Sequence, residues 1–257
     1  MAVYVISDLH GQYKMFKKLL EKAAFSDADQ LYMLGDAIDR GPDGIKILQY
    51  VMNTPNMHFL LGNHEFMMLN AVDLNGSASA YADYLPGRDA ALWYYSNGGN
   101  KTYAKYKRLK KADRMKLLDW LINRPLSTKV EVNGNTYLLT HSFFNLDKID
   151  VPYKDIDYET VWDIVWQSPF RWDLYLDNKE YTKYEPWVFI IGHVPTCHAD
   201  ENEEPRPLST YKEDNIIDID GCCAHYDKDE AAYKGGILLR LDDLQEFTIT
   251  FEELNKR

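Results

Sequence analysis

Short apolar runs that end in polar side chains mark the first part of the chain. The run 3–6, Val-Tyr-Val-Ile, predicts a buried strand, because it is short, apolar and followed by a turn residue, Gly11. Four later runs have the same form, and in each an Asp, Asn or His follows within two residues: 30–34, 58–61, 136–140 and 187–191. Apolar residues at helical spacing over 15–23 and 45–52 predict helices between the first three strands. This β-α-β order favours a largely parallel sheet with right-handed crossovers.

The second half of the chain is richer in strand signals. Asn133-Gly134 lies between two alternating segments, 129–132 and 136–139, and this dipeptide is typical of a tight hairpin. Further apolar runs occur at 215–219, 236–241 and 246–251, and a short acidic turn predicts that the last two are antiparallel. We therefore expect an α/β fold with two packed mixed β-sheets flanked by helices.

Two segments interrupt this pattern. Residues 75–125 carry no strand signal and predict a helical insertion that covers one side of the site. Residues 142–187 read as an irregular loop rich in Trp and Tyr. Those aromatic side chains can pack the loop against its own domain or stack on a nucleotide base. No linker composition or repeat divides the chain, so one domain over 1–257 is expected.

The net charge limits the binding partners that we expect for the protein, and the cysteine content limits the cellular compartments. A formal net charge of −11 argues against a nucleic-acid or membrane-surface binder. The three cysteines, Cys197, Cys222 and Cys223, are too few and too unevenly spaced for a disulfide framework, which favours a reducing compartment. No leader or membrane span is visible, so a cytoplasmic location is expected, with the oligomeric state left open.

The strongest chemical signal is the pair Asp8 and His10 at the end of the first strand. Residues two apart in a strand point to the same side, and burying an acid and an imidazole there is costly unless something pairs with them. A metal ion is a good candidate. The carboxyl ends of neighbouring strands gather at one edge of a sheet, so the polar residues that follow the other runs are the expected partners: Asp36, Asn63, His141 and His193.

The order of these motifs along the chain resembles a known family. The motifs are Asp8-x-His10-Gly11, Gly35-Asp36-x-x-Asp39-Arg40-Gly41, Gly62-Asn63-His64-Glu65, His141 and Gly192-His193. They resemble those of the calcineurin-like metallophosphoesterases, and most closely the phosphoprotein-phosphatase branch, because Asp39-Arg40-Gly41 follows Asp36. The resemblance spans residues 8 to 193. It implies a four-layer αββα sandwich.

The resemblance also implies a centre with two divalent or trivalent metal ions. Asp8, His10 and His193 together with Asp36 would hold the first ion. Asp36, Asn63 and His141 would hold the second, so that Asp36 bridges the pair. Mixed nitrogen and oxygen ligands suit Mn, Fe or Zn. Two such ions about 4 Å apart can activate a shared water, giving a metal-bridging hydroxide that attacks phosphorus.

Three further residues receive roles from the same resemblance. His64 would be the general acid, and Asp39 would orient its imidazole. Arg40 would bind phosphate oxygens through its planar guanidinium. The alternative for Asp39 and Arg40 is an ordinary surface ion pair. A second phosphate-binding Arg usually follows an aromatic residue in this branch, but here Gln167 follows Trp166, so Arg171 is the nearest candidate, with a structural role as its alternative.

These residues predict metal-dependent hydrolysis of phosphate monoesters. The expected substrate is phosphoserine or phosphothreonine on a protein, as in bacterial serine/threonine protein phosphatases, or a small phosphate ester. Two alternatives stay open. One is a symmetrical dinucleoside tetraphosphatase, in which the aromatic residues stack on bases, and the other is a metal-binding scaffold without activity. Asn97-Gly98-Gly99, after Trp93, resembles a segment that shapes the rim of the site in bacterial members of the branch.

Overall fold

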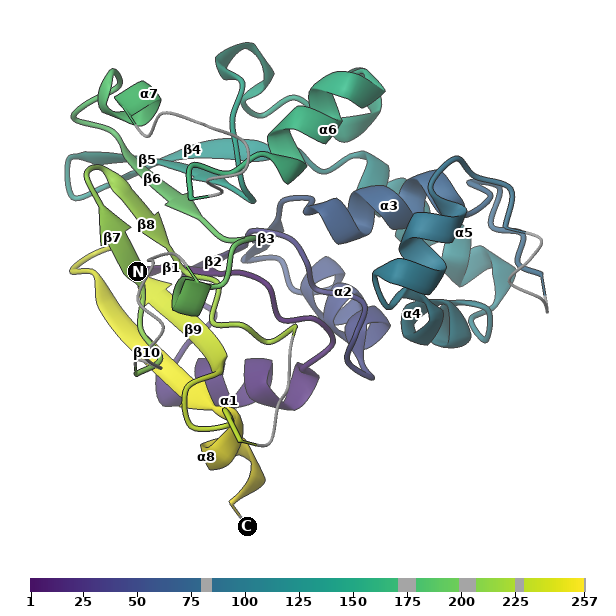
Figure 1. Ribbon diagram of the computed structural model, residues 1–257, viewed down its shortest axis with the longest axis horizontal. Helices are drawn as coiled ribbons and strands as arrows, with labels where there is room; N and C mark the ends of the chain where they lie inside the picture. Colours follow the sequence, from purple (N-terminus) through teal and green to yellow (C-terminus); the bar gives the residue numbers. More distant parts are fainter. Residues whose placement is uncertain (80–84, 171–178, 199–206, 225–228, 257) are drawn as a thin grey trace.

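Two five-stranded β-sheets form the centre of the protein, as a computed structural model of the chain shows (Figure 1). The structure describes residues 1–79, 85–170, 179–198, 207–224 and 229–256. The first sheet has the order β10-β9-β1-β2-β3 and the second the order β4-β5-β6-β8-β7. The strands are β1 (Val3–Ile6), β2 (Gln30–Met33), β3 (Met57–Phe59), β4 (Ser127–Val132), β5 (Asn135–Thr140), β6 (Val188–Ile191), β7 (Tyr211–Glu213), β8 (Ile216–Asp218), β9 (Gly235–Arg240) and β10 (Gln245–Thr250).

Both sheets are mixed, which confirms the expected fold class. In the first sheet β1, β2 and β3 are parallel, while β9 and β10 form the antiparallel pair predicted at the end of the chain. β9 also pairs antiparallel with β1, so the end of the chain returns to the strand with which it begins. In the second sheet β5, β6 and β8 are parallel, and β4 and β7 are antiparallel edges.

Alternating side chains of the strands divide the molecule into layers. Val3 and Val5 of β1 face the space between the sheets, where they pack with Leu139 of β5 and Ile190 of β6. Tyr4 and Ile6 point to the opposite side, into the core under the helices. Leu138, Phe189 and Ile191 fill a third cluster on the outer face of the second sheet. The central strands β1, β5 and β6 thus bury residues on both faces, as expected for the inner layers of a four-layer sandwich.

Helices cover the outer sides of the sheets (Figure 1). α1 packs on β9 and β10, and α2 packs on β3. In Figure 1, α3, α4 and α5 form a group at the right, and α6 and α7 lie above the second sheet. The helices are α1 (Tyr13–Lys22), α2 (Gly44–Met52), α3 (Asn63–Ala71), α4 (Gly99–Tyr106), α5 (Lys111–Ile122), α6 (Tyr158–Trp166), α7 (Lys179–Thr182) and α8 (Phe251–Asn255), with a π-helix η2 (Leu92–Ser96) and the 3₁₀ turns η3 (Leu146–Lys148), η4 (Tyr153–Asp155) and η6 (Thr196–His198). Within the described ranges, none of these helices is long and apolar enough to cross a membrane.

The aromatic segment is more regular than the sequence suggests. We expected an irregular loop over 142–187, but nine of these residues form α6. Asp157 caps the helix, because its side chain accepts the backbone N–H of Thr160 at 3.0 Å. Val161, Ile164 and Val165 are buried at helical spacing. Their weak intrinsic helix propensity is outweighed by this packing, which the sequence pattern did not reveal.

Candidate metal and phosphoester site

The predicted site residues meet where strands of both sheets end. Asp8 follows β1 and Asp36 follows β2, while Asn63 opens α3 after β3. His141 and His193 follow β5 and β6 of the second sheet. Burial is nearly complete for seven of the predicted residues, and Arg40 and His193 are half-buried. The buried seven are Asp8, His10, Asp36, Asp39, Asn63, His64 and His141.

Two groups of possible metal ligands share Asp36. One group is Asp8, Asp36 and His141, and the other is His10, Asp36 and His64. In each group the nearest ligand atoms lie within 4.8 Å of one another. His10 Nε2 lies 3.6 Å from Asp36 Oδ2, and His141 Nε2 lies 3.6 Å from Asp36 Oδ1. The two oxygens of one carboxylate therefore face two different groups, as a bridging ligand requires.

The grouping differs from the predicted ligand sets in two respects. Asp8 lies with His141, whereas the resemblance placed these residues on different ions. His64 was predicted to bind no metal, but its Nε2 lies 3.7 Å from Asp36 Oδ2. The imidazoles of His10 and His64 are in edge contact, with ring centroids 4.7 Å apart, so both rings reach the same carboxylate.

Hydrogen-bond acceptors converge around the amide of Asn63. The position that suits the Asn63 amide nitrogen best lies 3.1 Å from Asp36 Oδ2, 2.9 Å from His141 Nε2 and 3.2 Å from His193 Nδ1. Buried acceptors that lie this close together need a cation or a hydrogen-bond donor between them. The donor set of carboxylate, imidazole and amide side chains fits transition-metal ions such as Mn, Fe or Zn.

Hydrogen bonds to the main chain fix two of the three imidazoles that face Asp36. His10 Nδ1 lies 3.1 Å from the carbonyl oxygen of Ile38, and His141 Nδ1 lies 2.8 Å from that of Leu34. Each carbonyl oxygen accepts the N–H of Nδ1. In each ring Nε2 therefore carries no proton, and its lone pair points to the cluster. Such contacts commonly hold metal-binding histidines in one tautomer.

Unusual backbone conformations place these side chains. Six of the nine residues have φ between +40° and +75°, in the left-handed region that costs energy for residues other than glycine. The six are Asp8, His10, Asp36, Asp39, Arg40 and His193. Glycines complete the turns: a Cβ on Gly62 would lie 2.2 Å from Asp36 Oδ1, and one on Gly192 would lie 2.2 Å from Asp8 Oδ2. The chain thus folds tightly around the carboxylates.

Burial makes the carboxylates of the site difficult to ionise without a cation. Desolvation raises the pKa of Asp36 well above its usual value, and the nearby charges of Asp8 and Glu65 raise it further. Desolvation likewise raises the pKa of Asp8 and lowers the pKa of His10 well below its usual value. Bound cations would oppose the raised pKa values of the two carboxylates by favouring their anionic forms, and they would reinforce the lowered pKa of His10 by favouring the neutral imidazole.

Asp39 and His64 form a buried pair beside the cluster. His64 Nδ1 lies 2.7 Å from Asp39 Oδ2, so one proton is shared between them. Burial raises the pKa of Asp39 to about 8, and it lowers the pKa of His64 well below its usual value. Arg40 follows Asp39 directly, and the nearby Lys101 donates from Nζ to its carbonyl oxygen. Arg171, the expected second phosphate contact, lies outside the described residues.

Sequence reasoning missed three residues that support this pair and the Asp36 loop. Trp93 Nε1 donates to Asp39 Oδ2 at 2.8 Å, and Thr102 Oγ1 accepts the backbone N–H of Asp39 at 2.8 Å. Glu65 accepts the backbone N–H groups of Asp36, Ala37 and Gly62. Glu65 belongs to a recognised motif and Trp93 precedes another, but neither motif indicates which atoms these side chains contact.

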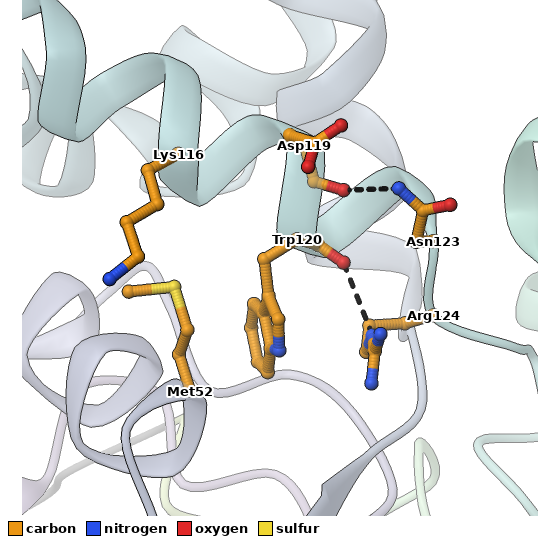
Figure 2. Close-up of a pocket in the computed structure, with 6 residues that line it drawn as sticks. All are labelled: Met52, Lys116, Asp119, Trp120, Asn123 and Arg124. Atoms are coloured by element: carbon orange, nitrogen blue, oxygen red, sulfur yellow. Dashed lines mark hydrogen bonds between the residues drawn. The ribbon is translucent and has the colours of Figure 1, made fainter.

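Other residues line a separate pocket (Figure 2). It has a volume of about 590 Å³ and lies between the end of α2 and the second half of α5. Figure 2 shows Lys116, Trp120 and Arg124 around it, with Arg124 Nε donating to the carbonyl oxygen of Trp120 at 3.2 Å. Its lining contains none of the predicted site residues: Met52, Lys116, Asp119, Trp120, Asn123 and Arg124.

Curated relatives of the chain include proteins that are named for two different activities. Over 163 residues the chain is 30% identical to serine/threonine-protein phosphatase 2 of Salmonella typhimurium, covering 62% of this chain and 66% of that protein. It is 36% identical over 94 residues to a symmetrical bis(5'-nucleosyl)-tetraphosphatase of Buchnera aphidicola, covering 35% of this chain and 34% of the relative. A protein of the same name from Acidovorax sp. is 31% identical, over 55% and 44% of the two chains. These matches span between a third and about two thirds of the relatives' lengths.

Solved structures and a family model agree on the fold. A point mutant of a cold-active protein tyrosine phosphatase superposes with a TM-score of 0.59 at 17% identity, covering 99% of this chain and 79% of that one. A metallophosphoesterase from Sphaerobacter thermophilus superposes with a TM-score of 0.54 at 16% identity, covering 96% and 87%. The model for calcineurin-like phosphoesterases matches residues 1–229. The chain therefore belongs to the calcineurin-like phosphoesterase family.

Proposed function

We propose that the protein hydrolyses phosphate monoesters with two metal ions, and that its substrates are phosphoserine and phosphothreonine on proteins. The observation that carries this proposal is the contact between His64 and Asp39, 2.7 Å long, beside two ligand groups that share Asp36. An acid–base pair beside a shared metal-binding carboxylate matches what phosphate ester hydrolysis needs: charge neutralisation at phosphorus and a proton for the leaving oxygen.

Asp8, His10, Asp36, Asn63, His141 and His193 would hold the ions. When bound there, the ions would lower the pKa of a water toward neutrality and so supply the nucleophile. Arg40, half-buried at the edge of the cluster, would bind and orient the phosphate through two parallel hydrogen bonds. Seven of the site residues are nearly completely buried, and electrostatic contacts are stronger where little water surrounds the charges.

His64 would donate a proton from Nε2 to the departing alkoxide. Its lowered pKa makes the imidazolium a stronger acid but reduces the protonated fraction. Asp39 raises the protonated fraction of His64 again, because its carboxylate accepts a hydrogen bond from the Nδ1–H group and stabilises the imidazolium. After this donation the His64 ring is neutral and keeps its proton on Nδ1. Its Nε2 can then take up a proton before the next turnover.

A direct assay tests this proposal. The purified protein, loaded separately with Mn, Fe or Zn, would be given phosphoserine and phosphothreonine peptides, p-nitrophenyl phosphate and diadenosine tetraphosphate. We expect phosphate release from the peptides and from p-nitrophenyl phosphate. Cleavage of the dinucleotide without turnover of any peptide would contradict the protein phosphatase assignment. Two bound ions without turnover of any ester would instead support the scaffold alternative.

One observation favours the dinucleoside tetraphosphatase as a second candidate. Trp166 meets the ring of His193 edge-on, with centroids 5.8 Å apart at 89°. Along α6, Trp162 stacks on Trp166 at 5.2 Å, and Tyr158 stacks on Trp162 at 6.1 Å. This row of half-buried rings leads away from the cluster and resembles a stacking surface for a base. Trp166→Ala should then reduce dinucleotide cleavage while leaving p-nitrophenyl phosphate hydrolysis nearly unchanged, and Trp120→Ala, on α5 outside this row, would be the matched control.

A further inference from the structure

We propose that Trp93 is a positioning residue for proton donation, acting on His64 through Asp39. Trp93 lies in the π-helix η2, some fifty residues after Asp39 in the sequence, and its side chain is fully buried. This inference rests on the proposed function, because it takes His64 as the general acid. It assigns a catalytic positioning role to the helical segment between 88 and 106, whose other described contacts with the site are to the main chain of Asp39 and Arg40.

Two hydrogen bonds to the Asp39 carboxylate converge on one oxygen. Trp93 Nε1 donates to Oδ2 at 2.8 Å, and His64 Nδ1 lies 2.7 Å from the same atom. The other oxygen, Oδ1, is buried and has no hydrogen-bond partner among the described residues. The indole and the imidazole therefore resist rotation of the carboxylate from the Oδ2 side, and the Thr102 side chain also favours the ionised carboxylate, because it lowers the pKa of Asp39. Without the indole N–H, His64 would be the remaining donor to Oδ2.

The main chain around Asp39 is held from the same helical segment. Thr102 Oγ1 accepts the Asp39 backbone N–H, and Gly98 packs against Arg40, where a Cβ would lie 3.0 Å from the Arg40 backbone nitrogen. Gly99 lies against the indole itself, because a Cβ there would come within 2.6 Å of two Trp93 ring atoms. The glycines of the Asn97-Gly98-Gly99 motif thus let this segment approach closely enough for Trp93 to reach Asp39.

This arrangement predicts a specific functional signature. A contact that positions the general acid affects the rate when the leaving oxygen must be protonated. It affects the rate little when the leaving group departs without protonation. The effect of losing the indole N–H should therefore depend on the leaving group and on His64. A residue that only stabilises the fold would reduce turnover of all esters equally.

The test uses Trp93→Phe, which keeps an aromatic ring and removes the donor, with Trp120→Phe on α5 as the matched control. We expect kcat for phenyl phosphate to fall about tenfold and kcat for p-nitrophenyl phosphate to fall less than about twofold, with KM and metal content unchanged. In a His64→Asn background the same substitution should have no further effect on either ester. Trp93→His, which retains a ring N–H, should recover part of the loss.

Several results would overturn the inference. Equal losses for both esters, a full additional loss in the His64→Asn background, or identical behaviour of Trp93→Phe and Trp93→His would each make Trp93 a packing residue. A readout that needs no turnover is the Nδ1 proton of His64 in ¹⁵N-histidine-labelled protein. We expect Trp93→Phe to shift this signal and speed its exchange with water, and an unchanged signal would contradict the inference. If the wild type hydrolyses no ester, the proposed function fails, while this spectrum still reports the Trp93–Asp39–His64 contact.

Discussion

The carboxylate of Glu65 lies against the loop that carries Asp36, and its Oε2 accepts the Asp36 backbone N–H at 2.8 Å. The same oxygen accepts the N–H of Gly62 at 3.1 Å, and Oε1 accepts that of Ala37 at 3.0 Å. Glu65 is fully buried. It therefore ties the loop after β2 to the start of α3, where the motif residues Asn63 and His64 lie.

Glu65→Gln should destabilise the fold. An amide has one acceptor oxygen, so its NH₂ group would face a backbone N–H and at least one hydrogen bond would be lost. We expect the free energy of unfolding to fall by about 2 kcal/mol. Urea denaturation in the presence of a chelator would measure this. Glu159→Gln, at a side chain that is 77% exposed, is the control and should change the stability little.

Glu65 also predicts a direction for the pH dependence of stability. Burial raises its pKa from 4.5 to about 7, so between these values the folded state binds more protons than the unfolded state. Its contribution to stability is fully present below about pH 4.5 and is lost as the pH rises through 7. In a chelator, the stability of the wild type should therefore fall more steeply over this interval than that of Glu65→Gln. Parallel curves for the two proteins would refute this assignment.

Asp36→Asn should weaken both metal sites together. Its two carboxylate oxygens face different ligand groups, and the substitution removes the charge that both groups share. We expect the bound metal to fall from two ions to fewer than one, with loss of activity. Elemental analysis after gel filtration measures this, and Asp43→Asn, at the start of α2, serves as the control. Loss of a single ion would show that Asp36 does not bridge.

His64→Asn should separate metal binding from catalysis. We expect both ions to remain, while turnover falls by about a hundredfold for phenyl phosphate and much less for p-nitrophenyl phosphate. Steady-state rates over a series of substituted phenyl phosphates would show this as a steeper dependence on leaving-group pKa. If metal content falls as well, the 3.7 Å approach of His64 to Asp36 reflects a ligand rather than an acid.

The sequence predicted the two sheets and the convergence of strand ends because these depend on local patterns. An apolar run that ends in Asp8 or Asp36 indicates both the strand and the edge of the sheet where the side chain will lie. It could not predict that β9 pairs with β1, because that contact joins residues more than two hundred positions apart. It also missed α6, since Val161, Ile164 and Trp166 are weak helix formers that packing holds in place.

The supporting contacts of the site were harder to predict than the gathering of its polar side chains. Trp93 reaches Asp39 only through the shape of a π-helix and the absence of a side chain at Gly99. No spacing rule connects an indole in one helix to a carboxylate in a distant loop. The placing of Asp8 and His141 in one group of possible metal ligands likewise depends on the positions of the side chains rather than on motif order.

The pairing of β1 with β9 has a consequence for the order in which the protein can assemble during its synthesis. Tyr4, Val5 and Ile6 are made more than two hundred residues before their antiparallel partners Arg240, Leu239 and Leu238. Asp8, next to that strand, also accepts the backbone N–H of His193 at 3.1 Å. The nascent chain must therefore keep one edge of β1 unpaired until β9 has been made, and contacts of such long sequence separation form slowly. Catalytic competence would arise only after β9 has been made.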